Sequence, residues 1–300
     1  MGDSLVTADP RMIGDLSIGP LAFGCWRFTD PDVATARHLV ETALEAGMNL
    51  VDTADVYGLD YGGEGFGHSE SILGEVLADA PHLRDRMVLA TKGGIAPPVP
   101  YDSSASYLTE ACDASLRRLG VDVIDLYQIH RPDLFTHPSE VAGALAALRD
   151  AGKIRHVGVS NFTPYQYDAL RAHLPFPLVT TQPEMSALHL DPIRDGTLDA
   201  AMRDGVTPLA WSALGGGRLA TGEGVRVELL TVLDRLAARE GVDRAAIATA
   251  FVLAHPSKPV VIVGSQTPAR ISAAGAALGV GLDRNDVYAV IEASEGVPLP

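Results

Sequence analysis

Four side chains of this sequence are suited to proton transfer: Asp52, Tyr57, Lys92 and His130. A tyrosine hydroxyl has a pKa of about 10 and is a poor acid at neutral pH, but an adjacent ammonium group stabilises the phenolate and lowers that pKa. Lys92 can supply the ammonium, and Asp52 can keep it charged and oriented. His130 can donate a hydrogen bond to a substrate oxygen beside the tyrosine. The set predicts a general acid for the reduction of a carbonyl group.

Reduction also requires a hydride, which no amino-acid side chain provides. The four residues therefore imply a bound nicotinamide. A structural alternative exists for part of the set, because Asp52 and Lys92 could form a buried ion pair that only holds the fold together. Taken alone, His130 would be better explained as a core histidine with satisfied hydrogen bonds.

The elements that must position these residues follow a repeated pattern. Short runs rich in Val, Ile and Leu alternate with longer Ala-rich segments of helical period, as in successive βα units. Eight such units indicate a closed parallel barrel, the (β/α)8 or TIM-barrel class. The predicted strands are 21–24, 49–52, 87–92, 123–130, 154–161, 178–182, 207–212 and 260–264, and the helices between them include 33–46, 69–80, 107–119, 139–151, 164–173 and 225–240.

Two additions to the barrel are expected. The segment 7–18 predicts a short hairpin before the first barrel strand, where it can close the lower end of the barrel. After the last strand, 268–278 and 284–292 predict two further helices. No linker or low-complexity tract interrupts the pattern, so residues 1–300 are expected to form one domain.

The predicted strands end in polar, aromatic or glycine residues, and Asp52, Lys92 and His130 end three consecutive strands. For one strand, the exit into a polar surface loop would explain such an ending. In a parallel barrel, however, all these ends open onto one face, where active sites are built from different strands. Three chemically matched endings in succession favour a site.

Composition restricts the class of protein further. The formal net charge of -15 repels nucleic-acid phosphates and anionic membranes, while a local site can still bind an anionic cofactor. Two cysteines are too few for a disulfide framework and lack the spacing of a metal site, and no stretch is apolar enough to span a membrane. We expect a cytoplasmic protein without bound metal, nucleic-acid partner or membrane partner. The sequence does not define its oligomeric state.

Six motifs, in order and each near a predicted strand end, resemble those of the aldo-keto reductase family, and in particular a bacterial branch with His-Arg-Pro-Asp and Leu-Gly-Gly-Gly-Arg motifs. The resemblance covers about residues 19–277. It implies that Tyr57 is the general acid, that Lys92 and Asp52 tune it, and that His130 orients the carbonyl. The motifs are Asp52-Thr53-Ala54 followed by Tyr57-Gly58, Lys92-Gly93, Ile129-His130-Arg131-Pro132, Gly158-Val159-Ser160-Asn161-Phe162, Trp211-Ser212, and Leu214-Gly215.

The same resemblance implies contacts to the cofactor. Ser160, Asn161 and Gln182 resemble residues that hold the nicotinamide carboxamide, and Trp211 stands where an aromatic ring stacks on the nicotinamide. Arg218 resembles the arginine that pairs with the pyrophosphate. Arg270 and Ser265 resemble residues that bind a ribose 2′-phosphate, and a site for that phosphate favours NADPH over NADH. A solvated Arg270 is the alternative. The remaining expected cofactor contacts are Gly24, Cys25, Trp26, Ser212, Leu214, Gly216, Gly264 and Gln266.

The substrate, a small carbonyl compound, is expected among Trp26, Phe28, Tyr57, His130 and Arg131. Arg131 would favour an acidic or hydroxyl-rich compound, unless Asp133 neutralises it.

Other functions fit the sequence less well. A regulatory subunit that binds NADP(H) without turnover would keep the same barrel, and the intact tetrad argues against it. A hydrolase would need the second glycine of a nucleophile elbow, and a Rossmann dehydrogenase would need Gly-x-Gly-x-x-Gly after the first strand. A metal-dependent barrel would need convergent histidine and carboxylate ligands, and His130 is the only histidine at a predicted strand end.

Overall fold

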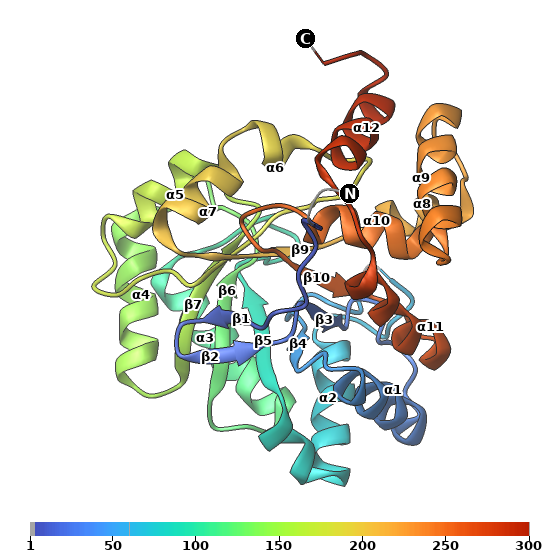
Figure 1. Ribbon diagram of the computed structural model, residues 1–300. Helices are drawn as coiled ribbons and strands as arrows, with labels where there is room; N and C mark the ends of the chain where they lie inside the picture. Colours follow the sequence, from blue (N-terminus) through green and yellow to red (C-terminus); the bar gives the residue numbers. More distant parts are fainter. Residues whose placement is uncertain (1–3, 60, 300) are drawn as a thin grey trace.

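The computed structural model describes residues 4–59 and 61–299. Within these residues, eight parallel strands close into a barrel that is surrounded by helices, which confirms the predicted fold class (Figure 1). In barrel order the strands are β3 (Leu21–Gly24), β4 (Leu50–Asp52), β5 (Val88–Gly93), β6 (Ile124–Ile129), β7 (Ile154–Ser160), β8 (Thr180–Gln182), β9 (Thr207–Ala210) and β10 (Val260–Val263). Pairing of β10 with β3 closes the barrel.

The helices connect the strands, and several of them begin at side-chain caps. Asp32 accepts a hydrogen bond from the backbone of Thr35, and Thr163 forms a capping box with Gln166. The α-helices are α1 (Val33–Glu45), α2 (His68–Asp79), α3 (Ala105–Leu119), α4 (Pro138–Asp150), α5 (Pro164–Arg171), α6 (Asp191–Arg194), α7 (Thr197–Asp204), α8 (Arg218–Thr221), α9 (Val227–Glu240), α10 (Arg244–Leu253), α11 (Pro268–Ala273) and α12 (Arg284–Glu295). The 3-10 helices are η1 (Pro81–Arg86), η2 (Gly215–Gly217) and η3 (Ala274–Gly279).

The hairpin before the barrel is formed by β1 (Arg11–Ile13) and β2 (Leu16–Ile18), which lie in front of the barrel strands in Figure 1. Ile13 and Ile18 are buried and pack in one apolar cluster with Leu50 and Val260, at the ends where these strands begin. The hydroxyl of Thr207 donates to the carbonyl of Met12 at 2.6 Å. The hairpin therefore closes the lower end of the barrel, opposite the face on which the strands end.

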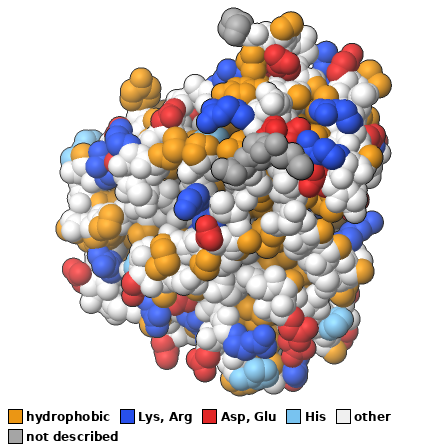
Figure 2. All heavy atoms as spheres, viewed as in Figure 1, with side chains coloured by type: hydrophobic (Ala, Val, Ile, Leu, Met, Phe, Trp, Pro, Cys, Tyr) orange, Lys and Arg blue, Asp and Glu red, His pale blue; other side chains and the backbone are white. Residues whose placement is uncertain are grey.

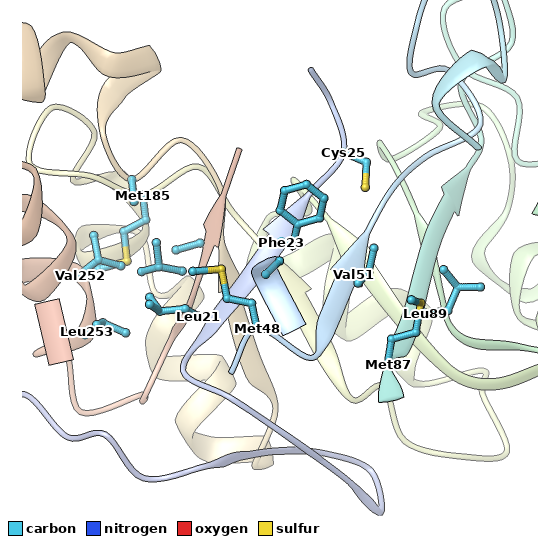
Figure 3. Close-up of a cluster of buried hydrophobic side chains, with 14 of the residues drawn as sticks. Leu21, Phe23, Cys25, Met48, Val51, Met87, Leu89, Met185, Val252 and Leu253 are labelled. Atoms are coloured by element: carbon cyan, nitrogen blue, oxygen red, sulfur yellow. The ribbon is translucent and has the colours of Figure 1, made fainter. Parts of the chain in front are cut away.

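The larger apolar core lies between the strands and the surrounding helices. In Figure 3, Phe23 and Cys25 point into this region, with Val51 and Leu89 of the neighbouring strands nearby. The same core includes Val252 and Leu253 of α10, a helix whose last eight residues are buried. Close packing on this scale fixes the strand ends, and with them the side chains of the site.

The surface shown in Figure 2 carries acidic and basic side chains interspersed with apolar ones. Across residues 4–59 and 61–299, no helix is both long enough and apolar enough to cross a membrane.

Candidate active site

The tetrad predicted from the sequence comes together at the carboxyl ends of β4, β5 and β6. Nζ of Lys92 donates hydrogen bonds to Oδ2 of Asp52 at 2.6 Å, to the carbonyl of Thr53 at 2.9 Å and to the hydroxyl of Tyr57 at 3.0 Å. The ring of His130 meets the Tyr57 ring edge-on, with centroids 5.6 Å apart. A substrate oxygen between the tyrosine and the histidine would therefore meet two possible donors.

Lys92 is fully buried, and its charge is maintained by its partners. Burial of the ammonium lowers its pKa, but the Asp52 carboxylate and Tyr57 outweigh burial and hold the pKa of Lys92 above its usual value. Lys92 is therefore a permanent cation at physiological pH.

The pKa of Tyr57 differs from the sequence-based expectation. Burial raises the pKa of Tyr57 above its usual value, and Asp52 adds to this effect. Lys92 acts in the predicted direction, towards a lower pKa, but does not outweigh burial. The expectation of a net lowering was wrong because the sequence does not show how deeply the hydroxyl lies. The consequence is that Tyr57 carries its proton at neutral pH, which is the form that a general acid needs.

His130 is neutral at physiological pH. Burial, reinforced by the cations Lys92 and Arg131, holds the pKa of His130 well below its usual range. Its Nδ1 has no hydrogen-bond partner within the described part of the chain. A neutral imidazole carries one N–H and can donate one hydrogen bond to a substrate oxygen.

The Asp52 carboxylate has hydrogen-bond donors other than Lys92. Its Oδ1 accepts hydrogen bonds from the side-chain amides of Gln182 at 3.1 Å and Gln128 at 3.3 Å. Gln182 was predicted as a cofactor contact, whereas sequence reasoning missed Gln128. Its place two residues before His130, on the same face of β6 as the histidine, was a signal that could have found it.

The residues expected around the nicotinamide form a connected polar group. Asn161 donates to the carbonyl of His130 at 3.2 Å and to the hydroxyl of Ser160 at 2.8 Å, and it accepts from the indole N–H of Trp211 at 3.1 Å. The Ser160 hydroxyl donates to the carbonyl of Gln182 at 3.0 Å. Asn161 and Ser212 both adopt φ near 59°, a left-handed conformation that costs energy in non-glycine residues and often occurs at functional sites. The structure thus brings Ser160, Asn161, Gln182 and Trp211 together beside the carbonyl of His130.

The glycine run after β9 leaves backbone open to solvent. Gly215, Gly216 and Gly217 have φ of 57°, 73° and 103°, and a Cβ atom added at Gly216 or Gly217 would meet nothing within 4 Å. Leu214 starts this turn by accepting from the amide of Gly217 at 3.0 Å. Arg218 is exposed beside it, and its Nε donates to the carbonyl of Gly215 at 3.1 Å.

The segment expected at the adenosine end lies between β10 and α11. A Cβ atom at Gly264 would again meet nothing within 4 Å. The hydroxyl oxygen of Ser265 accepts from the amide of Thr267 at 3.2 Å, and the Gln266 amide turns back to the carbonyl of Ser265 at 3.3 Å. Arg270 is exposed on α11.

The residues at and after the end of β3 differ in how far they are exposed to solvent. Gly24 packs closely, since a Cβ there would lie 2.6 Å from Ile262. Cys25 is fully buried, so only its backbone could face a cofactor, and burial raises the pKa of its thiol above the usual value. Trp26 is 40% exposed and suited to contact a ligand. Phe28 is 2% exposed and packs edge-on against Phe23 in the apolar core.

Trp26, predicted as a substrate contact, belongs to an aromatic cluster with Tyr61. The rings of Trp26 and Tyr61 lie 4.9 Å apart, and the Arg27 guanidinium lies 5.3 Å and 5.5 Å from their centroids. Arg131, predicted as a substrate contact, stands 5.9 Å from the Trp211 ring. Asp133 forms no salt bridge with Arg131 within the described part of the chain; its carboxylate accepts hydrogen bonds from the amides of Ser103 and Phe135 and from the Thr136 hydroxyl.

Comparison with known proteins decides the family. Residues 20–295 match the model of the aldo/keto reductase family. The chain belongs to this family. A 6-dehydroglucose reductase from Novosphingobium aromaticivorans is 51% identical over 288 residues, covering 95% of this aldo-keto reductase and 94% of the relative. A second 6-dehydroglucose reductase, from Agrobacterium fabrum, is 37% identical over 90% of the chain and 92% of its own length.

Among solved structures, a glycerol dehydrogenase from Gluconobacter oxydans superimposes with a TM-score of 0.84 at 29% identity, over 98% of this chain and 97% of that one. The family and these relatives make the aldo-keto reductase an oxidoreductase that acts on carbonyl or alcohol groups and uses a nicotinamide cofactor. Within residues 4–59 and 61–299, no three histidine, cysteine or acidic side chains are grouped as a metal site.

Proposed function

We propose that this aldo-keto reductase uses NADPH to reduce the aldehyde of a hydroxyl-rich compound, reversibly, with Tyr57 as the general acid. The observation that carries the proposal is the contact of 3.0 Å between the buried Lys92 ammonium and the Tyr57 hydroxyl. A permanent cation at this distance favours the phenolate that proton donation leaves behind.

Each residue of the tetrad has a defined task in this proposal. Tyr57 donates its proton to the carbonyl oxygen, and a bound nicotinamide would supply the hydride that the carbonyl carbon needs. Lys92 stabilises the resulting phenolate, and Asp52 keeps Lys92 oriented. His130, neutral and beside the Tyr57 ring, donates a hydrogen bond that orients the carbonyl. In the reverse direction the phenolate accepts the alcohol proton.

The chain offers suitable residues for NADPH. Ser160, Asn161 and Gln182 would hold the carboxamide, and the Trp211 ring would stack on the nicotinamide. The open backbone of Gly216 and Gly217 would approach the pyrophosphate beside Arg218. The remaining residues of the proposed cofactor site are Gly24, Cys25, Trp26, Ser212, Leu214, Gly264, Ser265, Gln266 and Arg270.

The proposed substrate class is supported by the names of two relatives and by the side chains of Trp26, Tyr61 and Arg131. Two similar proteins are named 6-dehydroglucose reductase. Trp26 and Tyr61 provide flat apolar faces for a sugar-like carbon chain, and Arg131 provides donors for its hydroxyl groups. We therefore propose 6-dehydroglucose or a related hydroxyl-rich aldehyde as the substrate of this chain.

The proposal treats residues 1–300 as one catalytic domain that works in the cytoplasm. The family match over 20–295 supports a single domain, and the free, buried Cys25 and Cys112 are compatible with a reducing compartment.

The test is consumption of NADPH or NADH by the purified enzyme with 6-dehydroglucose, glyceraldehyde and an aromatic aldehyde without hydroxyl groups. We expect turnover with NADPH, and a higher kcat/KM for the hydroxylated aldehydes. Tight NADPH binding without turnover of any carbonyl would reject the enzymatic function in favour of a regulatory nucleotide-binding role.

A further inference from the structure

Gln128, in the middle of β6, places a buried side-chain amide against the catalytic carboxylate. Its Nε2 lies 3.3 Å from Oδ1 of Asp52, and the residue is fully buried. A carboxylate only accepts hydrogen bonds, so the NH2 group of the amide must face Asp52 and its oxygen must point away. The orientation of Gln128 is thus fixed by chemistry.

The other end of the amide is also held. The Thr180 hydroxyl on β8 donates to Oε1 of Gln128 at 3.2 Å. Gly158 of β7 lies between the two strands, and a Cβ atom there would stand 1.9 Å from the Thr180 hydroxyl oxygen and 3.2 Å from Cγ of Gln128. The missing side chain at Gly158 leaves the space in which this hydrogen bond forms. Three neighbouring strands therefore contribute to holding one amide.

This arrangement divides the oxygens of Asp52 between two tasks. Oδ2 accepts from Lys92 at 2.6 Å, while Oδ1 accepts from Gln128 and from Gln182 at 3.1 Å. Donors on both oxygens prevent rotation of the carboxylate away from Lys92. Gln182 also belongs to the proposed cofactor site, whereas the side chain of Gln128 bonds only Asp52 and Thr180 among residues 4–59 and 61–299.

We propose that Gln128 is a positioning residue of the proton relay, which holds Asp52 so that one carboxylate oxygen stays on Lys92. The inference rests on the proposed reductase function. When the nicotinamide carboxamide is bound, the Gln182 side chain would also form a hydrogen bond with it. Gln128 would then remain the donor that bonds Asp52 without contacting the cofactor.

The proposal has an electrostatic consequence. A donor on Oδ1 disperses part of the negative charge of Asp52. Without that donor, the carboxylate opposes formation of the Tyr57 phenolate more strongly, because Asp52 already raises the pKa of Tyr57. Loss of Gln128 should therefore make Tyr57 a weaker acid and raise its pKa further.

The test compares Gln128→Met, which keeps the length of the side chain without its polar atoms, with Thr180→Val, which removes only the hydroxyl that orients the amide. Thr91→Val is the matched control, since Thr91 is equally buried on β5 but donates to Glu70 instead. For each folded variant, kcat and KM are measured against pH, and the dissociation constant of NADP+ is measured by quenching of tryptophan fluorescence.

We expect Gln128→Met to lower kcat about three- to tenfold, as for the loss of one hydrogen bond in the transition state, and to move the alkaline limb of the kcat profile to higher pH. KM and NADP+ affinity should stay unchanged. Thr180→Val should act in the same direction and add nothing to Gln128→Met in the double variant. Thr91→Val should leave the pH profile unaltered. A wild-type pH profile in folded Gln128→Met, or in Thr180→Val if Gln128→Met does not fold, would overturn the proposal.

A second readout keeps this inference separate from the proposed reaction. The pKa of Tyr57 can be followed by the ultraviolet absorbance of tyrosinate, with Tyr57→Phe subtracted. If the wild-type enzyme reduces no carbonyl but Gln128→Met still raises the Tyr57 pKa, the proposed function fails and the positioning role stands. If catalysis is normal and neither rate nor Tyr57 pKa changes, the positioning role fails alone.

Discussion

Nζ of Lys92 lies 3.0 Å from the Tyr57 hydroxyl, although the two residues are 35 positions apart. The distance is set by backbone contacts on both sides. Strand β5 pairs with β4, and the Tyr57 amide donates to the carbonyl of Ala54 while its own carbonyl accepts from Ser69 at the start of α2. The loop that carries the acid is thereby fixed between a strand end and a helix.

Tyr57→Phe removes the acid and leaves the ring. General acid catalysis contributes about 10²- to 10⁴-fold, so kcat for aldehyde reduction should fall by that factor while NADPH affinity persists. Steady-state NADPH oxidation and fluorescence titration measure the two quantities. Tyr107→Phe is the control, because the Tyr107 hydroxyl donates to the carbonyl of Ile95 away from the tetrad. Equal losses in both variants would show that Tyr57 is only structural.

The sequence was sufficient to predict the barrel and the tetrad. Apolar runs marked every barrel strand, and Asp52, Lys92 and His130 ended three of them. Helix α10 escaped prediction because its last eight residues are buried, which removes the periodicity that a half-exposed helix shows. The short helix α7 also escaped prediction.

Burial and strand register account for what the sequence could not predict. The contact of Gln128 with Asp52 depends on how β4 and β6 lie across the barrel, and the contact with Thr180 depends on the space at Gly158. Burial reversed the expected direction of the Tyr57 pKa and placed Phe28 in the core. These properties arise from packing among distant segments, which local sequence patterns do not encode.

Asp55 provides a prediction about stability. It is fully buried, and neither carboxylate oxygen has a hydrogen-bond partner within the described residues. Burial, reinforced by Glu70, holds the pKa of Asp55 well above its usual value. The folded protein therefore retains a proton that the unfolded chain loses above about pH 4, so the free energy of unfolding falls by about 1.4 kcal/mol per pH unit between that value and the raised pKa.

Asp55→Asn removes this penalty and should raise Tm at neutral pH, with a smaller gain near pH 4. Thermal unfolding at several pH values measures the effect. Asp125→Asn is the matched control, because Asp125 is equally buried but paired with Arg84 at 2.8 Å. It should lower Tm, since the substitution leaves a guanidinium without its partner. A lower Tm for Asp55→Asn across the pH range would contradict the assignment.

Arg131 provides a prediction about substrate charge. Its guanidinium lies 5.9 Å from the Trp211 ring, and we expect it to reach a carboxylate or hydroxyl group of a bound carbonyl compound. Arg131→Ala should lower kcat/KM for a keto-acid roughly tenfold more than for a neutral aldehyde, as for loss of a charge-assisted hydrogen bond. Arg149→Ala, which removes a guanidinium stacked on Phe176, should affect both substrates alike. Equal losses for both substrates in Arg131→Ala would exclude charge recognition.

Arg270 provides a prediction about the choice of cofactor. It lies exposed on α11, after the open backbone at Gly264 and the turn closed by Ser265. If it clamps a ribose 2′-phosphate, Arg270→Ala should weaken NADPH binding roughly tenfold or more and leave NADH binding unchanged, because only NADPH carries that phosphate. Fluorescence titration with both cofactors measures the difference, and Arg284→Ala, an exposed arginine at the start of α12, controls for the loss of one surface charge. Since the net charge is -15, removal of any arginine strengthens the long-range repulsion of an anionic cofactor, and this contribution disappears at high salt. If Arg270→Ala lowers NADPH affinity only at low ionic strength, Arg270 acts through the overall electrostatic field of the protein. If the loss of NADPH affinity persists at high salt and NADH affinity is unchanged, Arg270 contacts the 2′-phosphate.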